Sequence, residues 1–327
     1  MVSYDFGVGW PDIEENDLFL MALRSECQVR NMKFIVITEK DLPKIIKEIE
    51  NGKLHVEFYL DMASNIYDEN DLFSRLCYCL KDSGCYIVDD PDDVKSAADK
   101  SITHFKLSNA RIPTPYTIVI RHWAPSHRLI EEERHKLGSP FIIKPALGYG
   151  QKGVKIIHSH RPLKDISDAR LFDPGDNFLL QEIIKPVNLN GRPGWFRIYN
   201  LFGEIIPCWW HQETHEYWQV TLKETVEYHL LPVIKIAAEI AAIVKIDWFS
   251  CEIAISNKDN KFYAIDYMND QCAIYPKSQY KDGVPDDIIK IIAERLVEKA
   301  WRRKIGESTL TYRAIWFPKI KIIDENI

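Results

Sequence analysis

Apolar residues in the first hundred positions alternate between two spacings. Short apolar runs of strand length stand at 34–37, 56–60 and 85–88, and the segments 42–49 and 72–80 between them follow helical spacing. Strands that alternate with helices in this order pair in parallel, with the helices covering the sheet. The pattern therefore predicts an N-terminal α/β domain built on a parallel sheet.

After residue 98 the chain is expected to form α+β subdomains. A short helix is expected at 99–110, because Pro113 and Pro115 follow it, and the two further helices span 230–246 and 286–301. Strands are expected at 116–120, 141–144, 154–157, 178–184, 195–201, 204–210, 250–255 and 262–267. The expected division of the chain is 1–98, 99–185, 186–305 and a C-terminal tail at 306–327.

Composition and charge narrow the classes of function. The chain has 327 residues, enough for two or three packed subdomains, and a formal net charge of −6 without a long basic run, which argues against a nucleic-acid partner. Charged residues interrupt the most apolar stretch, 230–246, so no membrane span is expected, and no signal peptide is visible. The seven cysteines show no metal-binding spacing, which favours structural thiols and a cytoplasmic location.

A glycine-rich segment carries the first candidate chemistry. Gly148, Gly150 and Gly153 follow a predicted strand that ends at Lys144, and another predicted strand comes after them. Glycines let the backbone approach a ligand closely, successive amides can hold phosphate oxygens, and the lysine adds a point charge. A plain glycine-rich turn is the alternative. Both common helix-opening phosphate loops require a following helix, so neither fits.

A pair of acids on the last two predicted strands carries the second. Glu252 and Asp266 stand in apolar surroundings, and Asn269 and Asp270 follow closely. A carboxylate that faces a core without a partner is costly, so facing acids favour a cation between them. Oxygen ligands suit Mg²⁺ or Mn²⁺. The alternative is that these acids face solvent.

Three further positions are polar candidates: Lys100, the Gln181-Glu182 pair, and Arg197 on an aromatic-rich strand. The guanidinium of an arginine makes bidentate contacts to phosphate or carboxylate. His211 and His215 have the spacing of a helical metal pair, but their neighbours predict a loop, which disfavours a metal there.

Taken in order, these segments resemble the ATP-grasp superfamily, which includes glutathione synthetase and D-alanine–D-alanine ligase. The resemblance covers about residues 85 to 300 and rests on four motifs at sensible spacing. They are DK at 99–100 with ARIPTP at 110–115, PFIIKPALGYGQKG at 140–153, LQEII at 180–184, and the two acids. The chain is most similar to uncharacterised bacterial ATP-grasp proteins with WFR, PCWW and DY.ND motifs, which here occupy 195–197, 207–210 and 266–270.

The resemblance implies an ATP-grasp fold with an N-terminal pre-ATP-grasp domain. It implies that Lys100 and Lys144 contact ATP phosphate beneath the glycine loop, and that Gln181, Glu182 and the main chain near Ile184 meet the adenine. Glu252 and Asp266 match the two acidic metal ligands, with Asp247 as an alternative for the first. The family carries Asn two residues after the second acid, where this chain has Met268, so Asn269 is the favoured third ligand and Asp270 the alternative. Arg197 matches the catalytic arginine, although Phe196 replaces the acid that usually precedes it.

The function implied is an ATP-dependent ligase that joins a carboxylate to an amine, or to a thiol, through an acyl phosphate. A kinase acting on a hydroxyl and a non-catalytic nucleotide- or peptide-binding module are the alternatives. The expected substrates are small molecules or peptides, and a homodimer is compatible with the sequence. The candidate substrate contacts are Asp61, Ser64, Trp209, Trp210, His211 and Tyr217.

Overall fold

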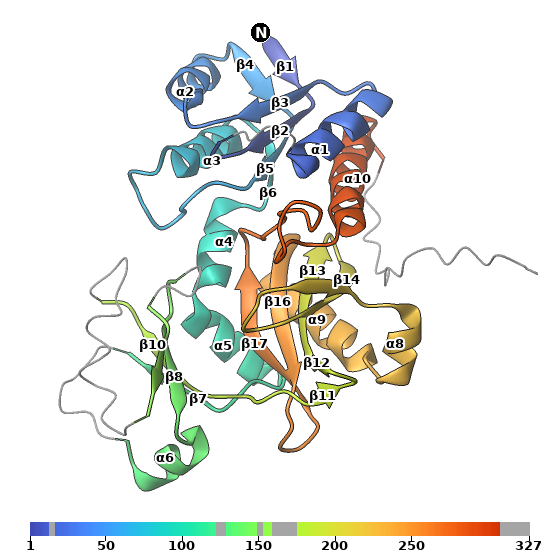
Figure 1. The fold of residues 1–327 in the computed structure, drawn as a ribbon. Coiled ribbons are helices and arrows are strands. Elements are labelled where there is room, and N and C mark those ends of the chain that lie inside the picture. Colours follow the sequence, from blue (N-terminus) through green and yellow to red (C-terminus); the bar gives the residue numbers. More distant parts are fainter. Residues whose placement is uncertain (13–16, 122–128, 149–152, 159–174, 308–327) are drawn as a thin grey trace, which may run out of the picture.

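The computed structural model describes residues 1–12, 17–121, 129–148, 153–158 and 175–307. These residues form three parts, each built on its own sheet (Figure 1). The N-terminal part is at one end, a five-stranded sheet forms the middle, and a small four-stranded sheet stands beside it. Among the described residues, no helix is long and apolar enough to cross a membrane.

The N-terminal part is a parallel sheet with strand order β3-β2-β5-β6. Its strands are β2 (Phe6–Gly9), β3 (Phe34–Ile37), β5 (Phe58–Asp61) and β6 (Tyr86–Val88), and its helices are α1 (Leu18–Val29), α2 (Leu42–Glu50) and α3 (Leu72–Asp82). A two-stranded parallel pair, β1 (Val2–Tyr4) with β4 (Leu54–Val56), lies beside it. The aspartates before α1 and α3 accept hydrogen bonds from the first-turn amides, which explains where these helices begin.

Two short helices lead from this part into the rest of the chain. They are α4 (Pro91–Ala98) and α5 (Lys100–Asn109). Asp99 stands between them, and its carboxylate accepts hydrogen bonds from the amides of Ser101 and Ile102, which caps α5. The amide of Lys100 donates to the carbonyl of Ala146 at 3.0 Å, so the start of α5 is fixed to the small sheet.

The small sheet is antiparallel, with order β7-β10-β8-β9. It contains β7 (Thr117–Ile120), β8 (Phe141–Pro145), β9 (Lys155–Ile157) and β10 (Phe178–Glu182), and α6 (Glu131–Leu137) packs on it. Phe141, Ile143, Phe178 and Leu180 form its core.

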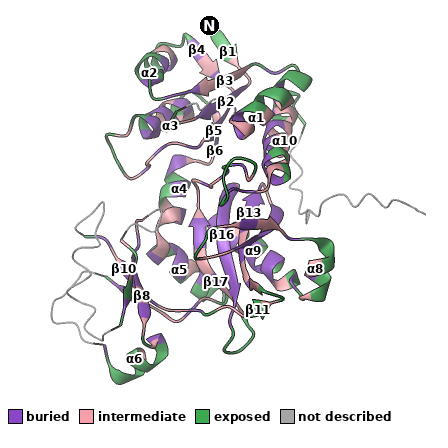
Figure 2. Cartoon of the chain, viewed as in Figure 1, coloured by how far each residue is buried: buried purple, intermediate pink, exposed green. Residues whose placement is uncertain are grey.

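The central sheet is also antiparallel, with order β15-β14-β13-β16-β17. Its strands are β13 (Trp195–Leu201), β14 (Glu204–Trp210), β15 (Tyr217–Gln219), β16 (Trp248–Ile255) and β17 (Phe262–Asn269). The helix α9 (Leu231–Val244) covers one face, with α8 (Leu222–Glu227) next to it, and the hairpin β11 (Asn188–Leu189) and β12 (Arg192–Pro193) lies at one end. Every residue of β14 and β16 is buried (Figure 2).

The last described helix, α10 (Asp286–Lys304), returns to the N-terminal part and packs along α1 (Figure 1). One hydrophobic core therefore includes apolar residues from α1, β2, β14, β16 and α10. The N-terminal part, which the sequence divides from the rest at residue 98, therefore shares a core with the central sheet and α10.

The mixed α/β class, the parallel N-terminal sheet and the hairpin of β13 and β14 confirm the sequence predictions. The sequence did not predict β2, which lies in the middle of the parallel sheet, or the helices α1, α4 and α6. The expected strand at 56–60 is two strands, β4 and β5, which belong to different sheets.

Candidate nucleotide and metal site

Two lysines, Lys144 of the small sheet and Lys100 of α5, lie where the small sheet meets the central sheet. The ammonium of Lys144, at the end of β8, is 7% exposed and donates to the carbonyl of Ile265 on β17 at 3.0 Å. Burial lowers the pKa of Lys144 to about 8, although the nearby carboxylate of Asp266 opposes that shift. The ammonium of Lys100 donates to the carbonyl of Gly148 at 2.6 Å. Both predicted phosphate ligands thus border the glycine segment.

The glycine segment joins β8 to β9, and these two strands pair antiparallel, with Phe141 opposite Ile157. The segment therefore connects two strands and opens no helix, as the sequence predicted. Gly153 has a φ of 78°, which favours glycine. Gly148 begins the segment, and Gly150 lies outside the described residues.

A chain of buried polar side chains joins the two sheets next to Lys144. The amide of Gln181, on β10, donates to the hydroxyl of Tyr267 at 3.2 Å and to the hydroxyl of Thr117 at 3.0 Å. The Tyr267 hydroxyl also shares a hydrogen bond of 2.8 Å with Nδ1 of His104. Burial lowers the pKa of His104 to about 4, so this imidazole is neutral at pH 7. Sequence reasoning named Gln181 but missed Tyr267 and His104, which look like ordinary strand and helix residues.

The predicted adenine contacts follow on β10. The carboxylate of Glu182 accepts a hydrogen bond of 3.4 Å from the amide of Tyr116 and lies 3.2 Å from the ammonium of Lys258. Ile184 is buried just beyond the strand. The adenine role of these residues stays a prediction.

The two predicted metal ligands lie side by side on neighbouring strands of the central sheet. Glu252 on β16 is the Cα partner of Asp266 on β17. Glu252 is 7% exposed, and burial raises the pKa of its carboxyl while Arg197 opposes that shift. Among the described residues, Oδ1 of Asp266 is buried without a hydrogen-bond partner. A buried carboxylate oxygen that lacks a donor fits a cation at this position.

A β-bulge decides which residue can complete this pair. Glu252 and Ser250 are two residues apart on β16 and lie on one face, and their partners on β17 are Asp266 and Asn269. Three steps along β17, from Asp266 to Asn269, thus match two steps along β16, from Glu252 to Ser250, and the register shifts between these pairs. The shift brings Asn269 opposite Ser250, on the face of Asp266, although three positions along β17 separate the two residues. This register favours Asn269 over Asp270 as the third oxygen ligand.

Within the part of the chain that is described, no three His, Cys, Asp or Glu side chains are grouped to hold a metal ion. If Glu252, Asp266 and Asn269 hold a metal ion, as the sequence predicts, water and phosphate oxygens would have to complete its ligands, an arrangement that is usual for Mg²⁺.

Arg197 is opposite Glu252 on β13, and their side chains form a buried ion pair. The guanidinium also donates to the hydroxyl of Tyr217 at 3.3 Å and lies 5.1 Å from the ring centre of Trp210. In the described chain its Nε is buried without an acceptor. The predicted catalytic arginine is therefore next to the predicted metal ligand.

The other predicted acceptor contacts on this sheet are not equivalent. Trp209 is 1% exposed in the core beneath α9, and its indole donates to Glu224. Trp210 and Tyr217 contact Arg197 instead. The imidazole of His211 accepts hydrogen bonds from two amides of its own loop. Asp247, the alternative metal ligand, accepts a hydrogen bond from Tyr86 of the N-terminal sheet.

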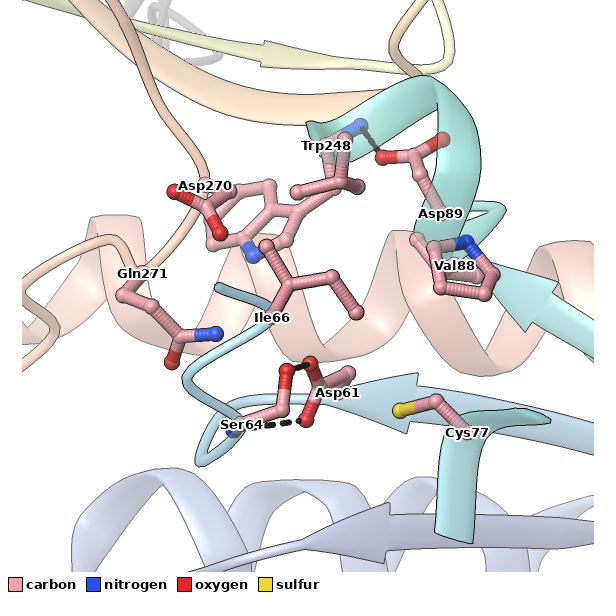
Figure 3. A pocket seen from close by; sticks show the side chains of 11 residues that line it. Asp61, Ser64, Ile66, Cys77, Val88, Asp89, Trp248, Asp270 and Gln271 are labelled. Atoms are coloured by element: carbon pink, nitrogen blue, oxygen red, sulfur yellow. Dashed lines mark hydrogen bonds between the residues drawn. The ribbon is translucent and has the colours of Figure 1, made fainter. Parts of the chain in front are cut away.

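A cavity lies between the N-terminal part and the central sheet (Figure 3). Asp61 and Ser64, the two substrate contacts suggested by the sequence, line it together with Asp89, Asp270 and Trp248. The hydroxyl and the amide of Ser64 donate to the carboxylate of Asp61. Burial raises the pKa of both Asp61 and Asp270.

Asp89 joins the two parts at this cavity. Its carboxylate accepts hydrogen bonds from the amide of Asp247 at 2.7 Å and from the amide of Trp248 at 2.9 Å. Burial raises the pKa of Asp89 to about 8. Sequence reasoning missed Asp89, although an acid directly after a strand of a parallel sheet is a signal of the kind that singled out Asp61.

Comparisons with known proteins identify the fold. No family model matches the sequence, and no curated protein matches it. Among solved structures, D-alanine–D-alanine ligase from Bacillus anthracis, complexed with ATP, has a TM-score of 0.62 at 15% identity and covers 94% of this chain and 100% of its own. The ATP-grasp ligase PsnB, complexed with a minimal precursor, Mg and ADP, has a TM-score of 0.60 at 12% identity, covering 92% and 99%. A RimK domain ATP-grasp protein from Sphaerobacter thermophilus has a TM-score of 0.60 at 13% identity, covering 90% and 98%. The chain therefore has the fold of the ATP-grasp superfamily.

Proposed function

We propose that the chain binds MgATP between the small and central sheets and uses it to activate a carboxylate for attack by an amine. One observation carries the proposal. Lys144 of the small sheet reaches β17 beside Asp266, so the lysines and the acids meet at one junction. Cations on one side and carboxylates on the other suit a triphosphate with its metal ion.

The residues of this chain have separate tasks in the proposal. Lys100 and Lys144 neutralise phosphate oxygens from the side of the small sheet. Arg197, which has a buried Nε without an acceptor among the described residues, steadies the acyl phosphate while the amine attacks. Such a site acts by positioning and by charge stabilisation, because phosphoryl transfer needs little covalent chemistry from the protein.

Glu252, Asp266 and Asn269 are the residues proposed to hold Mg²⁺ or Mn²⁺. When bound, the metal ion supplies positive charge against the phosphate oxygens. Oδ1 of Asp266, which is buried without a hydrogen-bond partner among the described residues, and the register shift between Asp266 and Asn269 support this assignment.

Asp61 and Ser64 are the proposed contacts of the acceptor substrate. They lie at the end of a strand of the parallel sheet, at the edge where ligands tend to bind. The similar protein PsnB is complexed with a minimal precursor in one structure and with a precursor peptide in another, which supports amino acids and peptides as the first substrates to examine.

The test is ATP-dependent condensation, with ADP and product mass as the readouts. The purified chain is incubated with MgATP and paired pools of amino acids and short peptides. Product formation is expected in wild type and lost in Lys144→Ala, whereas Lys235→Ala, which changes a lysine that is 76% exposed on α9, keeps wild-type turnover. A Lys144→Ala variant with wild-type turnover contradicts the assignment.

The same assay separates the alternatives. ADP release that requires both an acid and an amine supports ligation. ADP release with a single alcohol indicates a kinase. Nucleotide binding with no turnover for any acceptor indicates a binding module without catalysis.

A further inference from the structure

Glu252 is held by two neighbouring side chains of β13, on different oxygens. Arg197 contacts Oε1, and the indole N–H of Trp195 donates to Oε2 at 3.1 Å. Trp195 and Arg197 are two residues apart on one strand, so both side chains point to the same face. The Trp195 ring is itself packed against Trp210, with centroids 6.2 Å apart.

Two contacts fix this carboxylate in a way that one contact does not. The terminal torsion of a glutamate is broad, so a donor on one oxygen leaves the carboxylate plane free to turn. A second donor on the other oxygen fixes that plane. Each carboxylate oxygen accepts more than one hydrogen bond, so a metal ion can still bind while both donors remain.

The two donors differ in the charge that they bring. The guanidinium of Arg197 is a cation, and in the proposed function it also serves the acyl phosphate. The indole of Trp195 is a neutral donor that neither accepts a hydrogen bond nor binds a metal. It can therefore orient Glu252 without competing with a cation for the charge of the carboxylate.

We propose that Trp195 is a positioning residue that holds the carboxylate of Glu252 in the orientation needed for metal binding. This inference rests on the proposed function, because it requires a metal ion at Glu252 and Asp266. The WFR motif at 195–197 gives no role to Trp195, and only the pairing of β13 with β16 brings its indole to Glu252.

The experiment is a Mn²⁺ titration of the full chain with ADP, followed by electron paramagnetic resonance, so that no turnover is needed. Trp195→Phe keeps a ring against Trp210 but removes the N–H. The variant is expected to bind Mn²⁺ about 10- to 100-fold more weakly, the usual effect of removing a group that orients a metal ligand. Its affinity for ADP without metal is expected to stay within about twofold of wild type, because the lysines are unchanged.

Trp301→Phe is the matched control, since Trp301 lies on α10 and packs against the core that α10 shares with α1. It is expected to bind Mn²⁺ as wild type does. A wild-type chain that binds no Mn²⁺ overturns the metal site and the proposed function with it. If wild type binds Mn²⁺ and Trp195→Phe binds it equally tightly, only the role of Trp195 is overturned.

A second measurement is made on the wild-type chain, so it does not depend on how Trp195→Phe folds. The chain has nine tryptophans, so the indole N–H signals of nitrogen-15-labelled protein are few. Trp195→His assigns the Trp195 signal by its loss. With ADP present, Mn²⁺ is expected to broaden the Trp195 signal strongly and to leave that of Trp301 sharp. A Trp195 signal that stays as sharp as that of Trp301 overturns the proposal.

Discussion

Replacing Lys144 with methionine removes a buried ammonium from the junction of the two sheets and keeps a side chain of similar length. The pKa of this group falls from 10.5 to about 8 because burial disfavours its charge. At ~1.4 kcal/mol for each tenfold change, that shift corresponds to a cost of about 3 kcal/mol for folding with a charged Lys144 at pH 7. The free chain thus holds this ammonium at the expense of stability.

Methionine removes that cost but leaves the carbonyl of Ile265 without the donor that now lies 3.0 Å away. An unsatisfied buried carbonyl costs about 1–3 kcal/mol. The two effects oppose each other, so the variant is expected to be as stable as wild type at pH 7, or more stable by up to about 2 kcal/mol. It is also expected to lose ADP formation.

The pH dependence isolates the ammonium from other effects of the substitution. Because the pKa of Lys144 is lower in the folded chain, between pH 8 and 10.5 the unfolded state holds a proton that the folded state has lost, and stability rises with pH. Between pH 7 and 9.5, wild type is expected to gain about 2 kcal/mol relative to Lys144→Met. Urea titrations at both pH values measure this difference, and Lys235→Met, at an exposed lysine of α9, is the control.

Two results would refute this reasoning. A stability difference that does not change between pH 7 and 9.5 would mean that burial leaves the pKa of Lys144 near its ordinary value. A loss of more than about 2 kcal/mol at pH 7 would mean that attraction to Asp266 outweighs the cost of burial. In the second case, Lys144 would be a structural lysine.

Three further predictions concern the framework of the site. Arg197→Met leaves Glu252 buried without its cation and is expected to cost about 3–5 kcal/mol in urea unfolding, of which the added change Glu252→Gln should recover a part; additive losses would exclude the ion pair as the cause. Asp99→Ala removes the cap of α5 and is expected to cost about 1 kcal/mol by the same assay, and an unchanged urea midpoint would show that the cap is dispensable. Gly283→Ala places a Cβ 2.5 Å from the carbonyl carbon of Pro276 and is expected to cost about 1–3 kcal/mol, whereas a variant as stable as wild type would show that this loop yields freely.

Local patterns were enough where each element carries its own signal. The strands 195–201 and 204–210 have the bounds expected from their apolar runs and from the Phe202-Gly203 turn between them. The strand β2 has no such signal, because its four residues include Gly7 and Gly9. A Cβ on Gly9 would lie 2.1 Å from the hydroxyl of Tyr59, so a side chain of the neighbouring strand requires glycine at this position. Such a requirement is visible only once the sheet is formed.

The candidate site divides in the same way. By itself the sequence determined which residue types occur in which order: the lysines, the glycine segment and the two acids. These motifs are local, and their order along the chain is enough to suggest a nucleotide site.

The tertiary structure alone decided the rest, because strand pairing and burial set which groups meet. It placed Arg197 opposite Glu252 and added the indole of Trp195 to the same carboxylate. The register shift between β16 and β17 brought Asn269 to the face of Asp266, although three positions separate them along the strand. No spacing in the sequence gives that register, since it depends on how β17 pairs with β16.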